Sequence, residues 1–367
     1  MLKPLLTITV LLALAVPARA EPPRREAFEI AVDKAMTYLA NAQNQDGSWT
    51  SGGAAMRGGF NVGREPAVTA LCVMAFLSAG HVPGEGKYGG HLERGIKYVS
   101  DSQQANGLFS GQQFGMTVMY SHGICTLMVA EVIGLTPDRQ QAAKLRDQLA
   151  SAVRLINSAQ SRSLPHIGGW RYSIEPRDAD ISVTAWQVMA LRAAKNVGCD
   201  VPSTVVDRAV AYVKSCYEST SGGYRYTSNS HVTVPCTGAS ILSLELCGKE
   251  YHKSEQSLNA AGYLCQKQNI LNQNRPHFFY GIYYTAQAMF QIGGKYWDYY
   301  RQILHSLLLH PEQYAQRPGG FWTSMSHDDA NAGTNYCTAM AVLALTVEYR
   351  FLPIYQRSEE PDERTGK

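Results

Sequence analysis

A threonine in a similar apolar context recurs six times along this chain of 367 residues. The positions are Thr69, Thr126, Thr184, Thr237, Thr285 and Thr338, so successive intervals are 57, 58, 53, 48 and 53 residues by subtraction. Each threonine is followed by a run that is apolar nearly all round, such as Leu71–Leu77 or Met340–Leu345. A helix that is apolar on every side must be buried on every side, so the period predicts six repeats, each containing a buried helix.

A second helix of different character precedes the buried one. Its pattern is amphipathic, with one polar face, and is clearest at residues 31–43, 91–102, 146–160 and 206–216. A glycine-aromatic turn joins the two helices at Gly47–Trp49, Gly107–Phe109, Gly168–Trp170, Gly222–Tyr224 and Gly320–Trp322, whereas the fifth repeat has only Phe278–Gly281 in that place. Glycine ends a helix in the left-handed conformation, and the aromatic ring can then fill the junction.

Six such units give twelve helices. A closed ring with six inner helices, sheathed by six outer ones, surrounds every buried helix with neighbours. An open superhelical stack is the alternative, but it would need polar caps at its ends, and the sixth buried helix is as apolar as the others. We therefore predict an all-α protein with a single α6/α6 toroid.

The first residues are typical of a secretory signal peptide. Lys3 gives a positive start, Leu5–Val16 is almost wholly apolar, and Ala18–Ala20 offers a small-residue cleavage site. We expect residues 1–20 to be removed, residues 21–357 to form the toroid and residues 358–367 to form a disordered tail. A membrane anchor is the alternative, but the apolar run is short for a bilayer, and no later segment is long enough to span one. The protein is therefore predicted to be secreted or periplasmic.

Charge excludes one class of partner. Without Lys3 and Arg19, 31 basic residues stand against 30 acidic ones, counted from the 33 and 30 of the full chain. Such a balance, with no basic stripe, gives no reason to expect nucleic acid as a partner. Export would permit disulfides among the eight cysteines, although most lie within helical patterns; Cys199 with Cys216 is the pair to test first.

The repeats resemble those of the squalene and oxidosqualene cyclases and of the protein prenyltransferase β subunits. The cyclase repeat places an aromatic and an aliphatic residue before Gln, Gly and Trp at fixed spacing. Tyr38, Leu39, Gln43, Gly47 and Trp49 fit it fully, Tyr98–Phe109 fits with one change, and Leu155–Gln160 and Tyr263–Gln268 fit its first half. The resemblance implies that the Gln side chain ties a helix end to the next element while the aromatic ring stacks beside it.

The starts of the six inner helices should meet at one mouth of the ring. Free backbone N–H groups and the positive ends of the helix dipoles gather polar residues there. The residues four positions before the repeat threonines, with their neighbours, make this mouth polar and the default site: Arg64, Glu65, Tyr120, His122, Asp178, Asp180, His231, Thr233, Tyr280, Gly281, His327, Asp328, Asp329 and Thr334.

The sharpest local feature is Asp178–Asp180. In the cyclases, the resemblance implies an Asp-x-Asp-Asp motif at this place, whose acid protonates an alkene or epoxide. Asp178 and Asp180 match it, but Ile181 replaces the last aspartate, so the acid-tuning partner is missing. Capping of the third inner helix or positioning of a substrate is the alternative role. The candidate catalytic residues are Asp180, Asp178, His231 and His122.

The prenyltransferase resemblance implies a zinc site at the same rim. Asp180 and His231 match two ligand positions, but Ser182 occupies the cysteine position and is a poor zinc ligand. His122 would have to complete a rebuilt site, and hydrogen bonding of these histidines within the mouth is the alternative. We expect no metal and no cofactor.

The candidate substrate-binding residues are Glu65 and Arg64 together with aromatic side chains. Trp186, Tyr283 and Tyr336, with Tyr120 and Tyr280, are expected to line the cavity and contact a carbocation through their π faces, with a purely structural core role as the alternative.

Three functions remain open. The first is a cyclase- or prenyltransferase-like protein that binds or cyclises an isoprenoid or other hydrophobic ligand. The second is a secreted binding or scaffold protein without catalysis. The third is a glycan-active enzyme related in fold to polysaccharide lyases, for which Arg64, Glu65 and Arg177 are the available groups. Whether the chain is an enzyme is not decided by sequence, because fold does not fix function.

Overall fold

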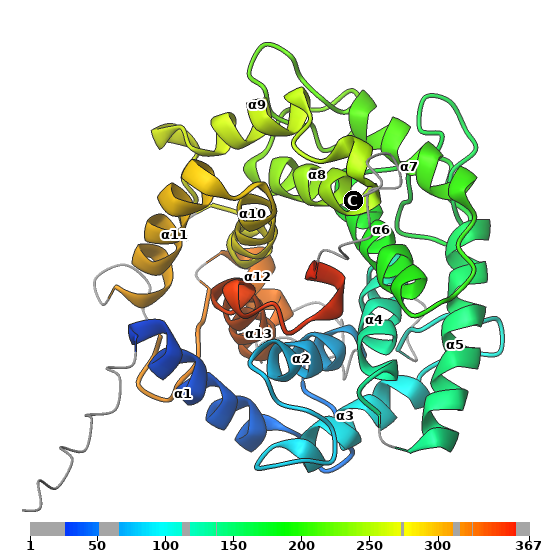
Figure 1. Ribbon diagram of the computed structural model, residues 1–367, viewed down its shortest axis with the longest axis vertical. Helices are drawn as coiled ribbons and strands as arrows, with labels where there is room; N and C mark the ends of the chain where they lie inside the picture. The colour runs from blue at the N-terminus through cyan, green and yellow to red at the C-terminus, as the bar shows by residue number, and fades with distance from the viewer. Residues whose placement is uncertain are drawn as a thin grey trace, which may run out of the picture.

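The computed structural model describes residues 26–50, 66–111, 118–136, 138–272, 275–310, 316–324 and 326–356. Within them the chain forms two concentric rings of helices (Figure 1). The inner ring is α2 (Pro66–Ser78), α4 (Val118–Ile133), α6 (Ile181–Asn196), α8 (Val234–Cys247), α10 (Phe278–Ile292) and α13 (Thr334–Leu345). The outer ring is α1 (Ala27–Ala42), α3 (Gly89–Asp101), α5 (Arg139–Ser158), α7 (Ser203–Ser215), α9 (Glu255–Leu264) and α11 (Gly294–Leu309).

These rings confirm the predicted α6/α6 toroid. The described part of the chain has isolated β-bridges, such as the one between Trp170 and Asp180, in place of a sheet. A short helix that the pattern did not predict, α12 (His327–Ala332), precedes α13. Four 3-10 turns complete the described elements: η1 (Lys249–Tyr251), η2 (Lys267–Asn269), η3 (Val347–Tyr349) and η4 (Pro353–Tyr355).

The ends of the chain close the ring on each other. The amide of Gln316, after the last outer helix, donates to the carbonyl of Ala31 in α1 at 2.6 Å. Between the first and last inner helices, the hydroxyl groups of Thr346 and Ser78 are hydrogen-bonded at 2.9 Å. The helices α13 and α2 therefore pack side by side, as Figure 1 shows, so that every inner helix packs against an inner helix on either side.

The glycine-aromatic turns join each outer helix to its inner helix by the same hydrogen bonds. The indole of Trp170 donates to the carbonyl of Ile156 at 2.8 Å, and the backbone N–H of Trp170 donates to the hydroxyl of Thr184 at 3.0 Å. Trp49 bonds Leu39 and Thr69 in the same way, and Trp322 bonds Leu308 and Thr338. The recurring threonine is therefore the acceptor that fixes the turn to the buried helix.

The glutamine that precedes each of four turns bridges neighbouring repeats. The Gln160 amide donates to Gly168 within its own repeat and to Val205 in the next, both at 2.9 Å. Gln43, Gln103 and Gln316 make the equivalent pair of bonds. The ends of these four outer helices, α1, α3, α5 and α11, are thus tied to the next outer helix around the ring.

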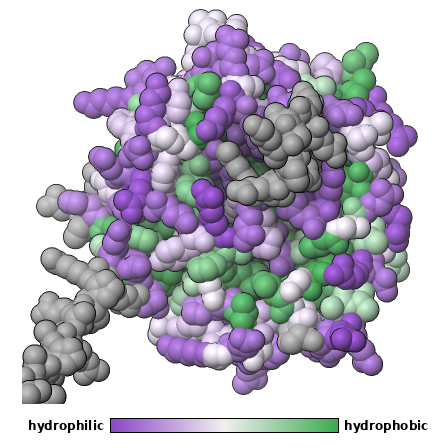
Figure 2. Space-filling view, in the orientation of Figure 1, coloured by the Kyte–Doolittle hydropathy of each residue, from purple (hydrophilic) through white to green (hydrophobic). Residues whose placement is uncertain are grey.

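The C-terminal segment crosses the centre of the ring at the ends of the inner helices, shown in red in Figure 1. The hydroxyl groups of Tyr355 and Tyr283 are 2.5 Å apart, and the N–H of Ile354 donates to the Glu131 carboxyl at 3.3 Å. Burial raises the pKa of Glu131 to about 8. Hydrophilic side chains cover most of the face seen in Figure 2, and hydrophobic ones gather in its lower part.

None of the described helices is long and apolar enough to cross a membrane. The predicted signal peptide and the whole of the predicted tail lie outside the described residues. None of the eight cysteines, all of which lie in the described part of the chain, forms a disulfide, and Cys199 and Cys216 are therefore not paired with each other. Cys125, Cys236 and Cys337, at one position in three repeats, are buried fillers between inner helices.

Replacing Gly168 with alanine should destabilise the protein. Gly168 has a φ of +96°, and a Cβ there would lie 2.1 Å from the carbonyl oxygen of Arg208. Left-handed strain and the clash together should cost about 3 kcal/mol of unfolding free energy. Urea denaturation of the wild type and the variant measures this loss of unfolding free energy. Gly198→Ala is the matched control, because Gly198 has a φ of +82° with nothing within 4 Å, so it should lose only about 1 kcal/mol. Equal losses of unfolding free energy in the two variants would show that the clash with Arg208 does not contribute.

The stability of the protein should fall between about pH 4.5 and 8 through Glu131, whose pKa rises from 4.5 when unfolded to about 8 when folded. In this window the unfolded chain releases the proton that the folded protein keeps, so folding is disfavoured as the pH rises. Thermal unfolding of the wild type and Glu131→Gln from pH 5 to 8.5 checks this. The variant should gain stability relative to the wild type as the pH rises, and a pH-independent difference would refute the assignment.

Candidate active site at the N-terminal rim

The starts of the inner helices form one rim of the ring, here called the N-terminal rim. Asp180 caps α6, and its Oδ1 accepts the backbone N–H of Val183 at 2.9 Å and the hydroxyl of Ser182 at 2.5 Å. Thr233 caps α8 at the equivalent position by accepting the N–H of Cys236 at 3.2 Å. The capping role considered for Asp180 is thus present in the structure.

The second carboxylate oxygen of Asp180 is not used by the cap. Asp180 is fully buried, and its Oδ2 makes no hydrogen bond of good geometry with the described residues. It lies 3.4 Å from Nη1 of Arg171, which is also 3.6 Å from Asp178 through its Nε. Burial raises the pKa of Asp180, while its hydrogen bonds to Ser182 and Val183 and the charge of Arg171 act in the opposite direction. Asp180 is therefore a buried acid whose Oδ2, free of the cap, lies beside Arg171, while Tyr226 also lowers its pKa.

A chain of hydroxyl groups connects this acid to the half-buried Tyr120. The phenol of Tyr120 is hydrogen-bonded to the Ser182 hydroxyl, which donates to Asp180. On the other side, the hydroxyl groups of Tyr172 and Tyr226 are 2.5 Å apart, and the guanidinium of Arg171 lies over both rings at 4.5 and 5.5 Å. The arrangement can move a proton between Asp180 and the phenol of Tyr120.

Sequence reasoning missed Arg171, Tyr172 and Tyr226. A signal was present: the third and fourth repeats both contain Gly-Gly-aromatic-Arg-Tyr, at residues 168–172 and 222–226. The aromatic residues of these turns, Trp170 and Tyr224, are buried between helices. Tyr172 and Tyr226, two positions later, lie at the N-terminal rim, where their hydroxyl groups meet. We had assigned this turn a structural role only.

His122, expected as a catalytic or zinc-binding residue, is surrounded by backbone groups that contact both of its ring nitrogens. It is fully buried, its Nδ1 accepts the N–H of Phe109 at 3.1 Å, and its Nε2 lies 3.2 Å from the carbonyl of Ala152. Burial lowers its pKa to about 4. His122 thus does in the second repeat what Thr184 does in the third, with both ring nitrogens occupied by backbone groups.

The other expected residues are dispersed. His231 is exposed in the loop before α8, and Asp178 is half-exposed beside Arg171. Arg64 and Glu65 lie outside the described residues. Among the residues that are described, no three His, Cys, Asp or Glu side chains come together as a metal site would require.

The expected aromatic residues meet at the ring axis. Trp186 of α6 stacks on Tyr283 of α10 with ring centroids 5.5 Å apart, and it contacts Tyr284 edge-on at 5.4 Å. Because α8 separates α6 from α10 around the ring, these side chains must reach across its centre. With the Tyr283–Tyr355 bond below them, they fill the axis.

Tyrosine hydroxyl groups lie above this filled centre without partners. The hydroxyl groups of Tyr280 and Tyr284 are buried and make no hydrogen bond with the described residues. Tyr120 and Tyr336 are close enough to raise the pKa of Tyr284, after burial and Tyr283, so the four phenols share one region. A buried hydroxyl group without a partner is unfavourable, so this region is suited to a ligand with polar groups.

Comparison with known proteins supplies the relatives of this fold. The family model of the squalene-hopene cyclase C-terminal domain matches residues 7–123. No curated protein matches the chain at a significant level.

Among solved structures, the chain is similar to an α-1,6-mannanase of glycoside hydrolase family 76 from Salegentibacter, with a TM-score of 0.65, 9% identity, and coverage of 88% of this chain and 99% of that one. A family 76 mannosidase from Bacteroides thetaiotaomicron has a TM-score of 0.58 at 11% identity, covering 88% and 97%. A type II terpene cyclase from Scytonema has a TM-score of 0.56 at 13% identity, covering 89% and 99%.

These similarities correct one expectation and confirm another. The predicted cyclase- or prenyltransferase-like function is wrong, because the mannanases, which are glycan-active enzymes, match with higher TM-scores than the terpene cyclase does. The similarity in fold extends over nearly the whole chain of each relative. The chain therefore has the α/α toroid fold of these solved structures, as its repeats indicated.

Proposed function

We propose that this protein is a glycan-active enzyme that binds a saccharide at the N-terminal rim and cleaves it by acid catalysis from Asp180. The observation that carries the proposal is the acid itself: a buried carboxyl with a raised pKa, one oxygen free of the cap, and a hydroxyl chain to Tyr120. A carboxyl whose pKa is raised by burial can serve as the proton donor that cleavage of a glycosidic bond requires.

The rim also suits a ligand rich in hydroxyl groups. The unpartnered phenols of Tyr280 and Tyr284 are both donors and acceptors, and a sugar ring can satisfy both. At the level of Trp186 the centre of the ring is crossed by stacked aromatic rings that are almost fully buried. The expectation of an isoprenoid ligand is untested by the comparisons; the polar groups are the reason for proposing a saccharide instead.

In the proposed reaction, a protonated Asp180 passes its proton to Ser182, Ser182 passes its own to Tyr120, and Tyr120 gives its phenolic proton to the glycosidic oxygen. When Asp180 is protonated, the Asp180–Ser182 hydrogen bond runs from the acid to the hydroxyl group, the reverse of its direction with an ionised carboxylate. The bond from the oxygen to the sugar carbon breaks, and a water molecule adds to that carbon and returns a proton. Asp178, half-exposed and paired with the same arginine, supplies the second carboxylate that such a hydrolysis uses. Arg171 holds the two carboxylates in place.

The solved relatives suggest which substrate to try. One related structure is an inactive double variant of the Salegentibacter mannanase, with two adjacent aspartates replaced, in complex with α-1,6-mannotriose. We therefore propose α-1,6-linked mannose oligosaccharides as the first substrates. Secretion of the protein after cleavage behind Ala20 is part of the proposal. N-terminal sequencing of the exported protein should then give Glu21 as the first residue.

Asp180→Asn should abolish cleavage while keeping the helix cap, because an asparagine oxygen still accepts the N–H of Val183. Release of mannose or mannobiose from α-1,6-mannotriose should fall about 100-fold or more, as loss of a general acid does. Tyr120→Phe should lower kcat with little change in KM.

The matched control is Asp138→Asn, which alters the cap of the outer helix α5. It should leave turnover unchanged. Full activity of Asp180→Asn would disprove the catalytic role, whereas saccharide binding without turnover in the wild type would show a binding protein.

Tyr280→Phe should leave the free protein equally stable or more stable by about 1 kcal/mol, because the lost hydroxyl group has no partner among the described residues. It should weaken saccharide binding, measured by calorimetry. Tyr224→Phe is the control: its buried hydroxyl group is also unpartnered, but it lies in the turn before α8. That variant should bind normally. Unchanged binding by Tyr280→Phe would remove this tyrosine from the site.

A further inference from the structure

The opposite rim, at the ends of the inner helices, contains a cavity of about 770 Å³. It is lined by the last turns of α6, α8 and α10, by η1, and by residues 353–356 of the C-terminal segment. A smaller hollow of about 160 Å³ between α6, α7 and α8 adjoins it, and the two share Arg192, Lys195, Leu246, Cys247 and Glu250. The larger volume is within the range of small-molecule sites.

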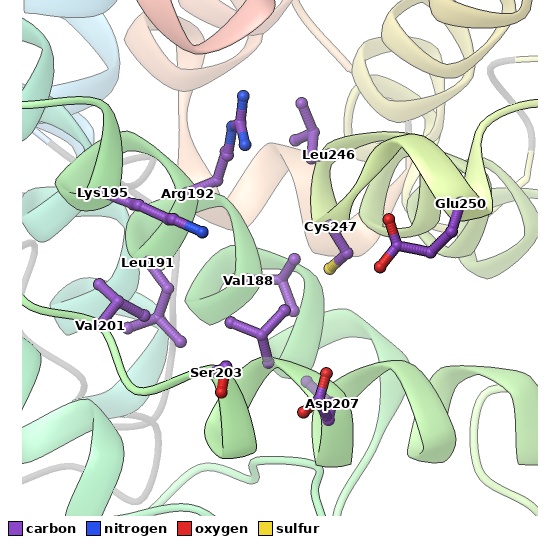
Figure 3. A pocket seen from close by; sticks show the side chains of 12 residues that line it. Val188, Leu191, Arg192, Lys195, Val201, Ser203, Asp207, Leu246, Cys247 and Glu250 are labelled. Carbon is purple, nitrogen blue, oxygen red and sulfur yellow. The ribbon is translucent and has the colours of Figure 1, made fainter. Parts of the chain in front are cut away.

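Two cations face this cavity without a counter-ion. Arg192 and Lys195 lie in the last two turns of α6, and neither forms an ion pair or hydrogen bond with any described residue. The Nε of Arg192 is buried as well as unpartnered. Figure 3 shows Lys195 extending from α6 toward Cys247 and Glu250 on the opposite wall. A buried guanidinium N–H without an acceptor is costly, and a bound oxyanion would supply the acceptor.

Carboxylates also line this region: Glu245 and Glu250 in the cavity and Asp207 in the adjoining hollow. Oε1 of Glu245 accepts the backbone N–H of Lys253 at 2.7 Å. The Glu250 carboxylate lies beside Gly248, where an added Cβ would be 2.5 Å from its Oε2. Among the described residues, none of these carboxylates forms an ion pair with Arg192 or Lys195.

We propose that this cavity is a binding site for a small oxyanion, held by Arg192 and Lys195 at the rim opposite the saccharide site. Arg192 offers its planar fork of donors from the inner wall, and Lys195 adds a mobile charge at the entrance. The C-terminal turn η4, which forms the facing wall, is held by Glu131 and Tyr283, so the cavity has a defined shape. The proposal does not depend on the proposed glycan chemistry.

The test is calorimetric titration of the full protein at low ionic strength with inorganic phosphate and, separately, with citrate. Saturable binding of one ion per chain is expected for at least one of them, and the stronger of the two identifies the oxyanion as phosphate-like or carboxylate-like. Arg192→Gln should weaken binding by about tenfold or more, since a charge-assisted hydrogen bond is lost. Lys195→Gln, at an exposed position that should not affect folding, should weaken it by a smaller factor and reduce its dependence on salt.

Arg154→Gln is the matched control, because Arg154 is an exposed arginine on α5 that bonds only Ser151 among the described residues. It should bind like the wild type. No saturable binding of either ion, or equal affinities for the wild type and both α6 variants, would overturn the proposal. Turnover of a saccharide by Arg192→Gln at the wild-type rate would show that the two sites are separate.

Discussion

The burial of inner helices that are apolar all round is the constraint on which the rest of the structure depends. Such a helix is stable only with neighbours on every side, and a ring gives that to all six at once. Closure then relies on contacts between residues at opposite ends of the chain, such as Gln316 with Ala31 and Thr346 with Ser78. Because the ring has no free end, neither the first nor the last repeat needs a polar cap.

The same constraint decides where chemistry can occur. The sides of the inner helices are packed, and at the level of Trp186 the axis is filled by aromatic rings and the C-terminal turn. Polar groups available to a ligand therefore lie at the two rims, where helix ends leave backbone groups unsatisfied. At one rim, the cap residue Asp180 has a second carboxylate oxygen that the helix cap does not use. At the other rim, Arg192 and Lys195 line a cavity without forming an ion pair with any described residue.

The repeat also shows how one position takes on different roles. The acceptor for the aromatic N–H is a threonine in most repeats and His122 in the second, so a residue type associated with catalysis serves the architecture there. The tyrosine two residues after the turn aromatic is at the rim in the third and fourth repeats, as Tyr172 and Tyr226, and takes part in the site. Structural and functional roles are thus distributed by repeat, which a motif alone does not reveal.

The sequence by itself determined the repeat, the two helix types, the turns between them and the closed ring, because these follow from periodicity and from glycine and apolar patterns that act over one repeat. It also placed Asp178, Asp180 and Tyr120 at one rim. Only the tertiary structure decided that Arg171 pairs with both aspartates, that Ser182 links Tyr120 to Asp180, that His122 is fully engaged, and that Trp186 and Tyr283 meet across the axis. Two of these contacts, Tyr120 with Ser182 and Trp186 with Tyr283, join side chains from different repeats, and their distances depend on the curvature of the whole ring, which no local pattern encodes.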